Sequence, residues 1–475
     1  MSEAPVTRET ESQDGPEPSF REALRQPNVR ILAISRAASK LAMAVVSYGA
    51  MVYLAGQNAT QFQISLVSAS TYAAAFMFGI QGGMLADTLS KRIGLVVGYL
   101  AQALLCLLVP IFWGTDVGAL MFIMFLTSAI NQIVTPSIKS ATALVATPEQ
   151  LATASSTVSL VGSIASAAGS AVVAPLLIKV SGIEAVLAVG GVTYLVGAIR
   201  SINLPAEETA LRLRQALGKV DWRPSALSLK WNARWIVGER NVASMVLVGA
   251  IVVAMFEAFN TLIPVYVRDV LESDPANAIY IFAPAGIGFL IGTFLTPKLV
   301  ARYRERRVAI AALACLSGSM ILFGLVDAVA PVFAPLSPLR LVEWIFNVEI
   351  SESVLAASAI AIPANFGSTA AGVAVQVYIN RRVPVIRQGA IFGAEEVYEN
   401  ALTMVAVVVL GAIANVVGAQ YVFIFTPLVA GGVVLWLIRY SYRASGEVDL
   451  SARGAVGVLT DRSRDESSPS PQIRE

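Results

Sequence analysis

Twelve apolar runs, each of about 20 to 29 residues, divide this chain, and each is long enough to cross a lipid bilayer as one helix. Backbone groups inside hydrocarbon must be paired within a helix or a closed barrel. With 56% hydrophobic and 14% charged residues, the chain exposes too much apolar surface for a water-soluble protein of this length. The sequence therefore predicts an all-α polytopic membrane protein. The predicted spans are 31–54, 62–86, 93–113, 117–138, 152–180, 185–204, 242–267, 278–300, 308–330, 354–379, 390–417 and 421–440.

Basic residues alternate across the connections between these spans. The even-numbered connections carry nineteen Lys and Arg residues, and the odd-numbered ones carry only Lys179, Arg268 and Arg340. Connections rich in Lys and Arg stay in the cytoplasm. We therefore expect both termini to be cytoplasmic and the protein to lie in the plasma membrane. The asymmetry also supports the count of twelve, since one missed helix would disrupt the alternation.

A long polar segment divides the predicted spans six to six. We expect a disordered cytoplasmic tail at 1–28, a six-helix bundle at 29–204, a cytoplasmic linker at 205–240, a second bundle at 241–443 and a second disordered tail at 444–475. The first tail has no apolar core, so it resembles neither a signal nor a transit peptide. The linker mixes Trp with basic residues and Leu, which favours an interfacial helix over a flexible tether. Two matched bundles with a site near the midplane are typical of transporters.

A glycine-rich motif ends the second span, at 82–92. Gly82 and Gly83 permit close helix packing, Ala86 precedes Asp87, and the basic pair Lys91 and Arg92 follows. Asp87 could face the positive N-terminal end of a helix from the other bundle and latch the inner gate. The alternative is a solvated helix end.

This motif resembles the signature loop between helices 2 and 3 of the major facilitator superfamily, although a glycine usual after the aspartate is absent. The segments 24–30, 131–155 and 262–271 are similar to the drug-efflux and siderophore-export branch of that superfamily, which includes macrolide efflux proteins and the enterobactin exporter. The resemblance implies the major facilitator fold, with twelve transmembrane helices as two six-helix bundles. One departure is that 162–175 lacks the glycine-proline cluster common in exporters of this superfamily.

Ionisable residues inside the spans are the first candidates for function, because burying each one in lipid is costly unless it is paired or wetted. Arg36 and Lys40 share a face of the first span at about 8 to 15 Å depth. Glu395 and Glu399, with Glu396 between them, reach similar depth in span 11. The opposite charges predict a switch that attracts the bundles when the inner side is closed. Snorkelling to the interface is the alternative, favoured for Glu395 and open for Arg36.

Glu257 in span 7 is the deepest lone carboxylate, and Asn260 follows one turn later. Low dielectric favours the neutral carboxylic acid, so Glu257 is a candidate for proton coupling. The alternative is a residue of the outer mouth that bonds to a neighbour. In span 4, Asn131 and Gln132 are candidates either for binding substrate in the cavity or for bonding other helices.

Enzymatic chemistry has little support in the sequence. There is no His, the two Cys lie within spans, and no phosphate-binding loop follows a strand. We therefore expect no enzyme activity, no cofactor, no zinc or haem site and no nucleic-acid partner. The expected partners are a small-molecule substrate, protons and membrane lipid, and we expect a monomer.

The resulting prediction is a secondary active transporter that works by alternating access. It exports amphipathic or hydrophobic small molecules, such as a drug, macrolide or siderophore, with coupling to protons. The apolar spans with few fixed charges indicate the substrate class, and the resemblance implies the direction. A lysophospholipid or lipid flippase, an importer of the same fold, and a non-transporting scaffold or sensor remain alternatives.

Overall fold

The computed structural model describes residues 24–146, 150–205, 240–346, 349–382 and 385–443. These residues form helices joined by short connections, and they contain no strand. Ten of the helices are long and apolar enough to cross a membrane, or eleven if one bent pair counts as a span. The prediction of an all-α membrane protein is therefore confirmed. The predicted tails and linker lie almost wholly outside the described residues.

The first group of helices covers the six predicted spans of the first bundle. Its members are α2 (Pro27–Gly56), α3 (Gln61–Thr88), α4 (Lys91–Trp113), α5 (Val117–Val145), α6 (Leu151–Ala168), a π-helical turn at Gly169–Val173 and α7 (Ala174–Ser201). Helix α7 breaks at Gly182, whose φ of 78° suits a residue without a side chain. This break lies between predicted spans 5 and 6. The continuous helical stretch from α6 to α7 therefore covers both of these spans.

The second group covers the remaining spans. Its members are α10 (Arg240–Asp269), α11 (Ile279–Tyr303), α12 (Glu305–Gly324), α13 (Val326–Phe333), α14 (Leu339–Phe346), α15 (Glu352–Arg382), α16 (Val385–Val417) and α17 (Ala419–Arg443). Predicted span 9 was too long: α12 ends at Gly324, and Leu325 leaves the helical conformation before α13 starts in a new direction. Helices α13 and α14 were not predicted.

Local sequence fixes several helix ends. Thr60 and Gln63 form a reciprocal capping box at the start of α3. Asp116 caps α5 by accepting a hydrogen bond from the amide of Ala119 at 2.8 Å.

Close packing of α3 on α5 depends on a glycine. A Cβ at Gly82 would lie 2.6 Å from the backbone of Gln132, so the two helices meet with no room for a side chain.

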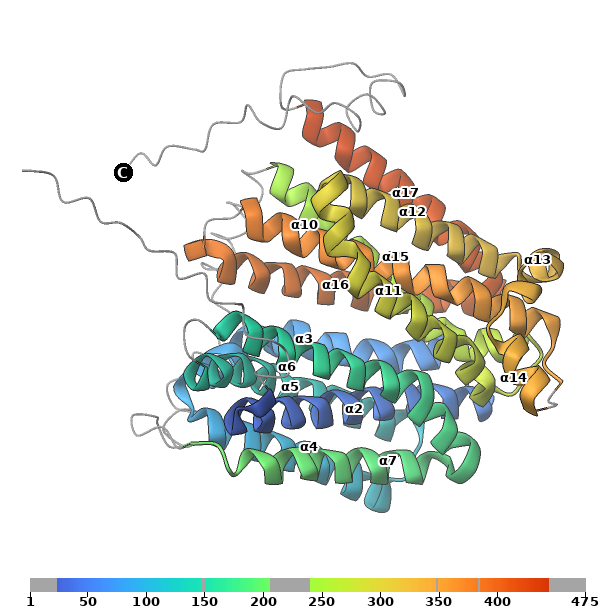
Figure 1. Cartoon of the computed structure of the whole chain (residues 1–475). Coiled ribbons are helices and arrows are strands. Elements are labelled where there is room, and N and C mark those ends of the chain that lie inside the picture. The colour runs from blue at the N-terminus through green and yellow to red at the C-terminus, as the bar shows by residue number, and fades with distance from the viewer. Residues whose placement is uncertain (1–23, 147–149, 206–239, 347–348, 383–384, 444–475) are drawn as a thin grey trace, which may run out of the picture.

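The two groups lie against each other along one seam (Figure 1). Within the first group α2 packs on α6 and α7, and α3 packs on α5; within the second, α15 packs on α11 and α12, and α10 on α16. Helices α3 and α16 pack across the seam.

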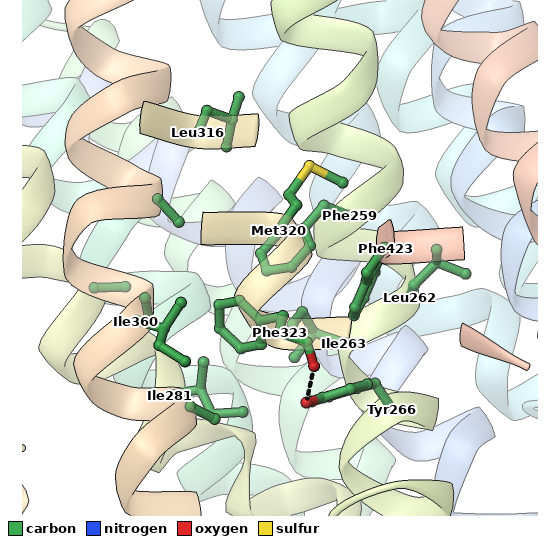
Figure 2. Close-up of a cluster of buried hydrophobic side chains, with 14 of the residues drawn as sticks. Phe259, Leu262, Ile263, Tyr266, Ile281, Leu316, Met320, Phe323, Ile360 and Phe423 are labelled. Atoms are coloured by element: carbon green, nitrogen blue, oxygen red, sulfur yellow. Dashed lines mark hydrogen bonds between the residues drawn. The ribbon is translucent and has the colours of Figure 1, made fainter. Parts of the chain in front are cut away.

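The second group has an aromatic core around Phe259, Phe323 and Phe423. There Tyr266 donates a hydrogen bond to the carbonyl of Phe323 at 2.7 Å (Figure 2).

The two ends of the bundle differ. We call the end that contains Pro27, Ser90 and Arg382 the basic end, and the end that contains Gly56, Gly114 and Asp269 the far end. The large buried cluster of the second group also includes Tyr48 and Val52 of α2, and the ring of Tyr48 contacts that of Phe282 on α11 at 4.7 Å between centroids. The described clusters at the basic end stay within one group, with Val242, Val300 and Tyr378 in one, and Leu85 and Leu89 in the other. The groups are therefore joined chiefly toward the far end.

Candidate functional site

A carboxylate lies at the seam in the middle of the bundle. Glu257 on α10 accepts a hydrogen bond from the hydroxyl of Tyr72 on α3 at 2.9 Å, so the two groups of helices are linked there. Lys40 on α2 interacts electrostatically with Glu257 and more strongly with Glu396 of α16, although no ion pair joins Lys40 to either side chain. A carboxylate and an ammonium from opposite groups thus flank the centre of the seam.

Polar contacts continue from Glu257 toward the far end. Thr261, one turn along α10, donates its hydroxyl to the Glu257 carbonyl at 2.8 Å and lies 3.0 Å from the hydroxyl of Ser68. Gln61 donates to the carbonyl of Thr261 at 3.5 Å. These contacts all cross between α3 and α10 or lie beside that crossing. They form a polar ladder along the seam, with the ionisable group at its inner end.

Asn260 is adjacent in sequence to Thr261 on α10, three residues after Glu257. Its side chain is half-buried, and the side-chain oxygen Oδ1 is buried without a hydrogen-bond partner among the described residues. A buried acceptor without a partner is costly. Asn260 therefore offers an acceptor for a ligand or water next to Glu257.

Two basic residues fasten the far end across the seam. Arg268 at the end of α10 donates to the carbonyls of Ala55 and Ala59, at 2.9 and 3.4 Å. Ala55 lies in the last turn of α2, where carbonyls lack partners within the helix and attract cations. On the other side, Lys179 of α7 donates to the side-chain oxygen of Asn277 at 3.0 Å. Charged hydrogen bonds therefore join the two groups at the far end, one donated from each group.

The predicted gating motif forms the end of α3 at the basic end. Lys91 donates to the carbonyls of Ala86, Asp87 and Leu89, so it caps the last turn of α3. The side chain of Asp87 is exposed, that of Ala86 is buried, and Arg92 is half-buried. A Cβ at Gly83 would meet nothing within 4 Å, which leaves the close approach to α5 to Gly82. The gating role of the motif stays a prediction.

The charges predicted to form a switch make no ion pair with each other in the described residues. Arg36 turns into its own group, where it donates to Thr135 at 3.1 Å and packs against Gly162. Glu395 lies near Gly249 of its own group, and Glu399 is half-buried. Glu396, between them, is close enough to attract both Arg36 and Lys40 electrostatically without forming an ion pair. A switch whose ion pairs form only when the basic end closes is consistent with these positions, and it stays a prediction.

The two polar residues of α5 bond within their own helix in this structure. Asn131 is buried and accepts from Thr135 at 3.4 Å, and Gln132 donates to the carbonyl of Ser128 at 3.3 Å. These hydrogen bonds join neither residue to another helix, so they test neither alternative. Their part in substrate binding stays a prediction.

Three residues with cross-seam contacts, Tyr72, Lys179 and Arg268, were not predicted from the sequence. Tyr72 carried one usable signal, a hydroxyl in the middle of an apolar span, but its partner is 185 residues away. Lys179 and Arg268 also carried a signal, because they break the charge asymmetry of the connections. Both of these exceptions cross the seam at the far end.

Together, these features define a multi-pass membrane protein with two helix groups, a central ionisable site and charged contacts that join the groups at the far end. The model of the Major Facilitator Superfamily matches residues 32–394, and the chain belongs to that family. A comparison with curated proteins found no match.

Solved structures share the fold at low sequence identity. A crystal structure of the nucleoside transporter NupG is similar with a TM-score of 0.61 and 14% identity, over 87% of this chain and 98% of that one. A POT family transporter in complex with 5-aminolevulinic acid has a TM-score of 0.61 and 13% identity, over 90% and 98%. The POT family transporter PepTSo has a TM-score of 0.58 and 12% identity, over 88% and 99%. Family and fold indicate a transporter rather than an enzyme.

Proposed function

We propose that this protein is a proton-coupled exporter of amphipathic or hydrophobic small molecules that works by alternating access in the plasma membrane. Glu257 is the proton-coupling group, Lys40 and Tyr72 are its partners, and Asn260 is the acceptor that orients substrate. With the basic end in the cytoplasm, as the distribution of Lys and Arg predicts, we interpret the joining of the groups chiefly toward the far end as an inward-facing state.

The observation that carries this proposal is the hydrogen bond from Tyr72 to Glu257 across the seam, with Lys40 nearby. An ionised carboxylate accepts this bond strongly and attracts Lys40. A protonated carboxylic acid loses the attraction to Lys40 and part of the bond strength. Proton binding therefore changes the free energy of holding the groups together, which is the differential interaction that coupling requires.

The other charged residues act in the opposite state. When the basic end closes, Arg36 and Lys40 come toward Glu395 and Glu399, and their attraction favours closure. The motif of Asp87, Lys91 and Arg92 at the end of α3 then latches the two groups. The contacts made by Arg268 and Lys179 break in that same state, so each end has its own set of charged contacts.

The substrate class follows from the residues around the centre. Phe256 and Phe259 of α10 stack near Glu257, and the spans carry few fixed charges. Apolar walls with a small number of polar groups suit a lipophilic molecule that carries a donor or a positive charge. The export direction rests on the resemblance of 131–155 and the other segments to the efflux branch.

Transport by purified protein in proteoliposomes tests the proposal. A proton gradient should drive uptake or release of a lipophilic cation, a macrolide or a siderophore. Glu257→Gln should abolish the gradient-driven flux and leave protein yield and folding unchanged. Glu352→Gln, at an exposed carboxylate outside the seam, is the matched control and should transport as the wild type does. Gradient-driven flux of wild-type rate in Glu257→Gln would refute the assigned role.

The alternatives predict different results in the same vesicles. A lipid flippase would move a fluorescent lysophospholipid between leaflets and leave the soluble panel untouched. An importer would move substrate in the same direction as the protons. A scaffold or sensor would transport nothing, and Glu257→Gln would have no effect on its function.

A further inference from the structure

The connection between α12 and α15 folds into a helical hairpin at the far end. Helix α13 and the following 3-10 turn meet α14 at an angle of 66° (Figure 1). Pro338 disfavours helical conformation at Ser337, whose ψ is 130°. The hydroxyl of Ser337 then accepts a hydrogen bond from the amide of Leu339 and bonds to Ser358 of α15. The bend is thus set by sequence and fastened to the bundle.

One face of α14 packs on the bundle. Leu339 is 8% exposed and lies in a cluster with Ala334 and Leu355, against which Val342 also packs. Arg340 and Glu343 form an ion pair at 3.1 Å, and Glu343 also accepts from the amide of Ile350. The polar groups of this helix are therefore largely satisfied by their own neighbourhood.

The opposite face of α14 is apolar and uncovered. Leu341, Trp344 and Ile345 stand three and four residues apart on this face, with exposed fractions of 65%, 83% and 63%. A helix that buries one apolar face in protein normally turns a polar face to water. Here both faces are apolar, and the outer one includes the most exposed Trp side chain in the described residues.

This patch continues onto surface that must face lipid. Leu336 and Val332 of the hairpin are also exposed, and Leu325 connects them to the end of the membrane-length helix α12. An eight-residue helix is about 12 Å long, far short of the roughly 30 Å hydrocarbon core. Its apolar face therefore cannot be covered by crossing the bilayer. Trp is the residue that concentrates at the headgroup level.

We propose that the α13–α14 hairpin is a membrane-anchoring element whose outer face, formed by Leu336, Leu341, Trp344 and Ile345, lies in the headgroup–acyl boundary of the leaflet at the far end. The occupant of this face is phospholipid, because the patch is continuous with the lipid-facing surface of α12. Paired Arg340 and Glu343 lie at the height of the headgroups. The proposal depends on membrane insertion of the chain, and it is independent of the substrate, the coupling ion and the direction of transport.

Trp fluorescence in vesicles of brominated phosphatidylcholine tests this placement. Two variants with a single Trp are compared, each with Phe at the other Trp positions. One keeps Trp344, and the other keeps Trp436, an exposed residue of α17. Emission of Trp344 should be quenched by lipid brominated near the headgroup end of the chain, and less by lipid brominated near the methyl end. Emission that is quenched by aqueous iodide but not by bromolipid would overturn the proposal.

A second measurement avoids the multiple Trp substitutions. Nitroxide labels are placed on Leu341→Cys and Ile345→Cys, with both native Cys replaced by Ala, and Glu349→Cys on the exposed connection after α14 is the control. Labels at 341 and 345 should collide more with oxygen than with a water-soluble nickel complex, and the label at 349 should show the reverse.

Occupants other than lipid give their own results. Protection of positions 341 and 345 from both oxygen and nickel, with a spin–spin coupling that grows as the protein-to-lipid ratio rises, would assign the face to a second copy of the chain. Accessibility of both positions to the nickel complex would assign it to water. Either outcome overturns the membrane placement.

Discussion

The far-end contact of Arg268 gives a quantitative prediction. Its guanidinium donates to the carbonyls of Ala55 and Ala59 across the seam, and it also pairs with the adjacent Asp269. Hydrogen bonds to a charged group contribute about 1.5 to 3 kcal/mol. Because the Arg268 side chain is 24% exposed and Asp269 is a competing partner, we expect a value around or slightly below the lower end of this range. Arg268→Met should therefore favour far-end opening by about 1 to 2 kcal/mol, which is roughly 5- to 30-fold in population.

Alkylation of a single cysteine measures that population. Ser68→Cys, with the native Cys replaced by Ala, places a thiol that is buried at the seam while the far end is closed. When opening is fast, its reaction rate with a hydrophilic maleimide is proportional to the open population. Arg268→Met should raise this rate by the same roughly 5- to 30-fold.

Two control variants make the result specific. Arg268→Lys keeps the charge and should fall between the wild type and Arg268→Met. Arg340→Met removes a far-end cation whose partner, Glu343, lies in its own helix, and it should leave the rate unchanged. A change of less than twofold in Arg268→Met, or an equal change in Arg340→Met, would refute the assignment of Arg268 as a cross-seam contact.

Two further predictions concern the seam and the packing of α3. Tyr72→Phe removes the hydrogen bond to Glu257, so proton-driven flux in proteoliposomes should fall about tenfold, as expected for a bond worth roughly 1.5 kcal/mol; undiminished flux would contradict the role of Tyr72. Gly82→Ala puts a Cβ 2.6 Å from the backbone of Gln132 and should cost about 1 to 3 kcal/mol, lowering the thermal unfolding temperature in detergent. Gly83→Ala meets no neighbour and should unfold as the wild type does, so equal effects at 82 and 83 would contradict the packing argument.

The fold was predictable because hydrocarbon imposes one length and one backbone solution. Twelve predicted runs are helical over nearly all their lengths, and the boundary between spans 5 and 6 falls at Gly182. The prediction from hydropathy was wrong at the end of span 9, where apolar residues continue after the helix has ended. The chain leaves the helical conformation at Leu325 and again before Pro338, so the apolar residues of α13 and α14 do not continue the membrane-length helix α12.

The site was predictable only in part. An isolated carboxylate in an apolar run is costly, so Glu257 could be predicted as a functional residue from the sequence of its own helix alone. Its partner Tyr72 is brought to it by tertiary packing of α3 on α10, which no local pattern encodes. Segment 162–175, which was singled out in the sequence for lacking a glycine-proline cluster, holds a π-helical turn at Gly169–Val173, which packs against α11 across the seam. Such turns widen a helix locally and are frequent at functional positions.

Paired distance measurements at both ends test the central claim that the two groups rock about the Glu257 centre. Spin labels at Gln57 and Tyr421 report the far end, and labels at Lys139 and Arg302 report the basic end; all four side chains are exposed, and each pair joins opposite groups. The wild type in lipid should show reciprocal changes when pH and substrate are varied, the far-end distance lengthening as the basic-end distance shortens. Glu257→Gln should lose the response to pH. Distances that stay fixed at both ends, or that change in the same direction, would contradict alternating access.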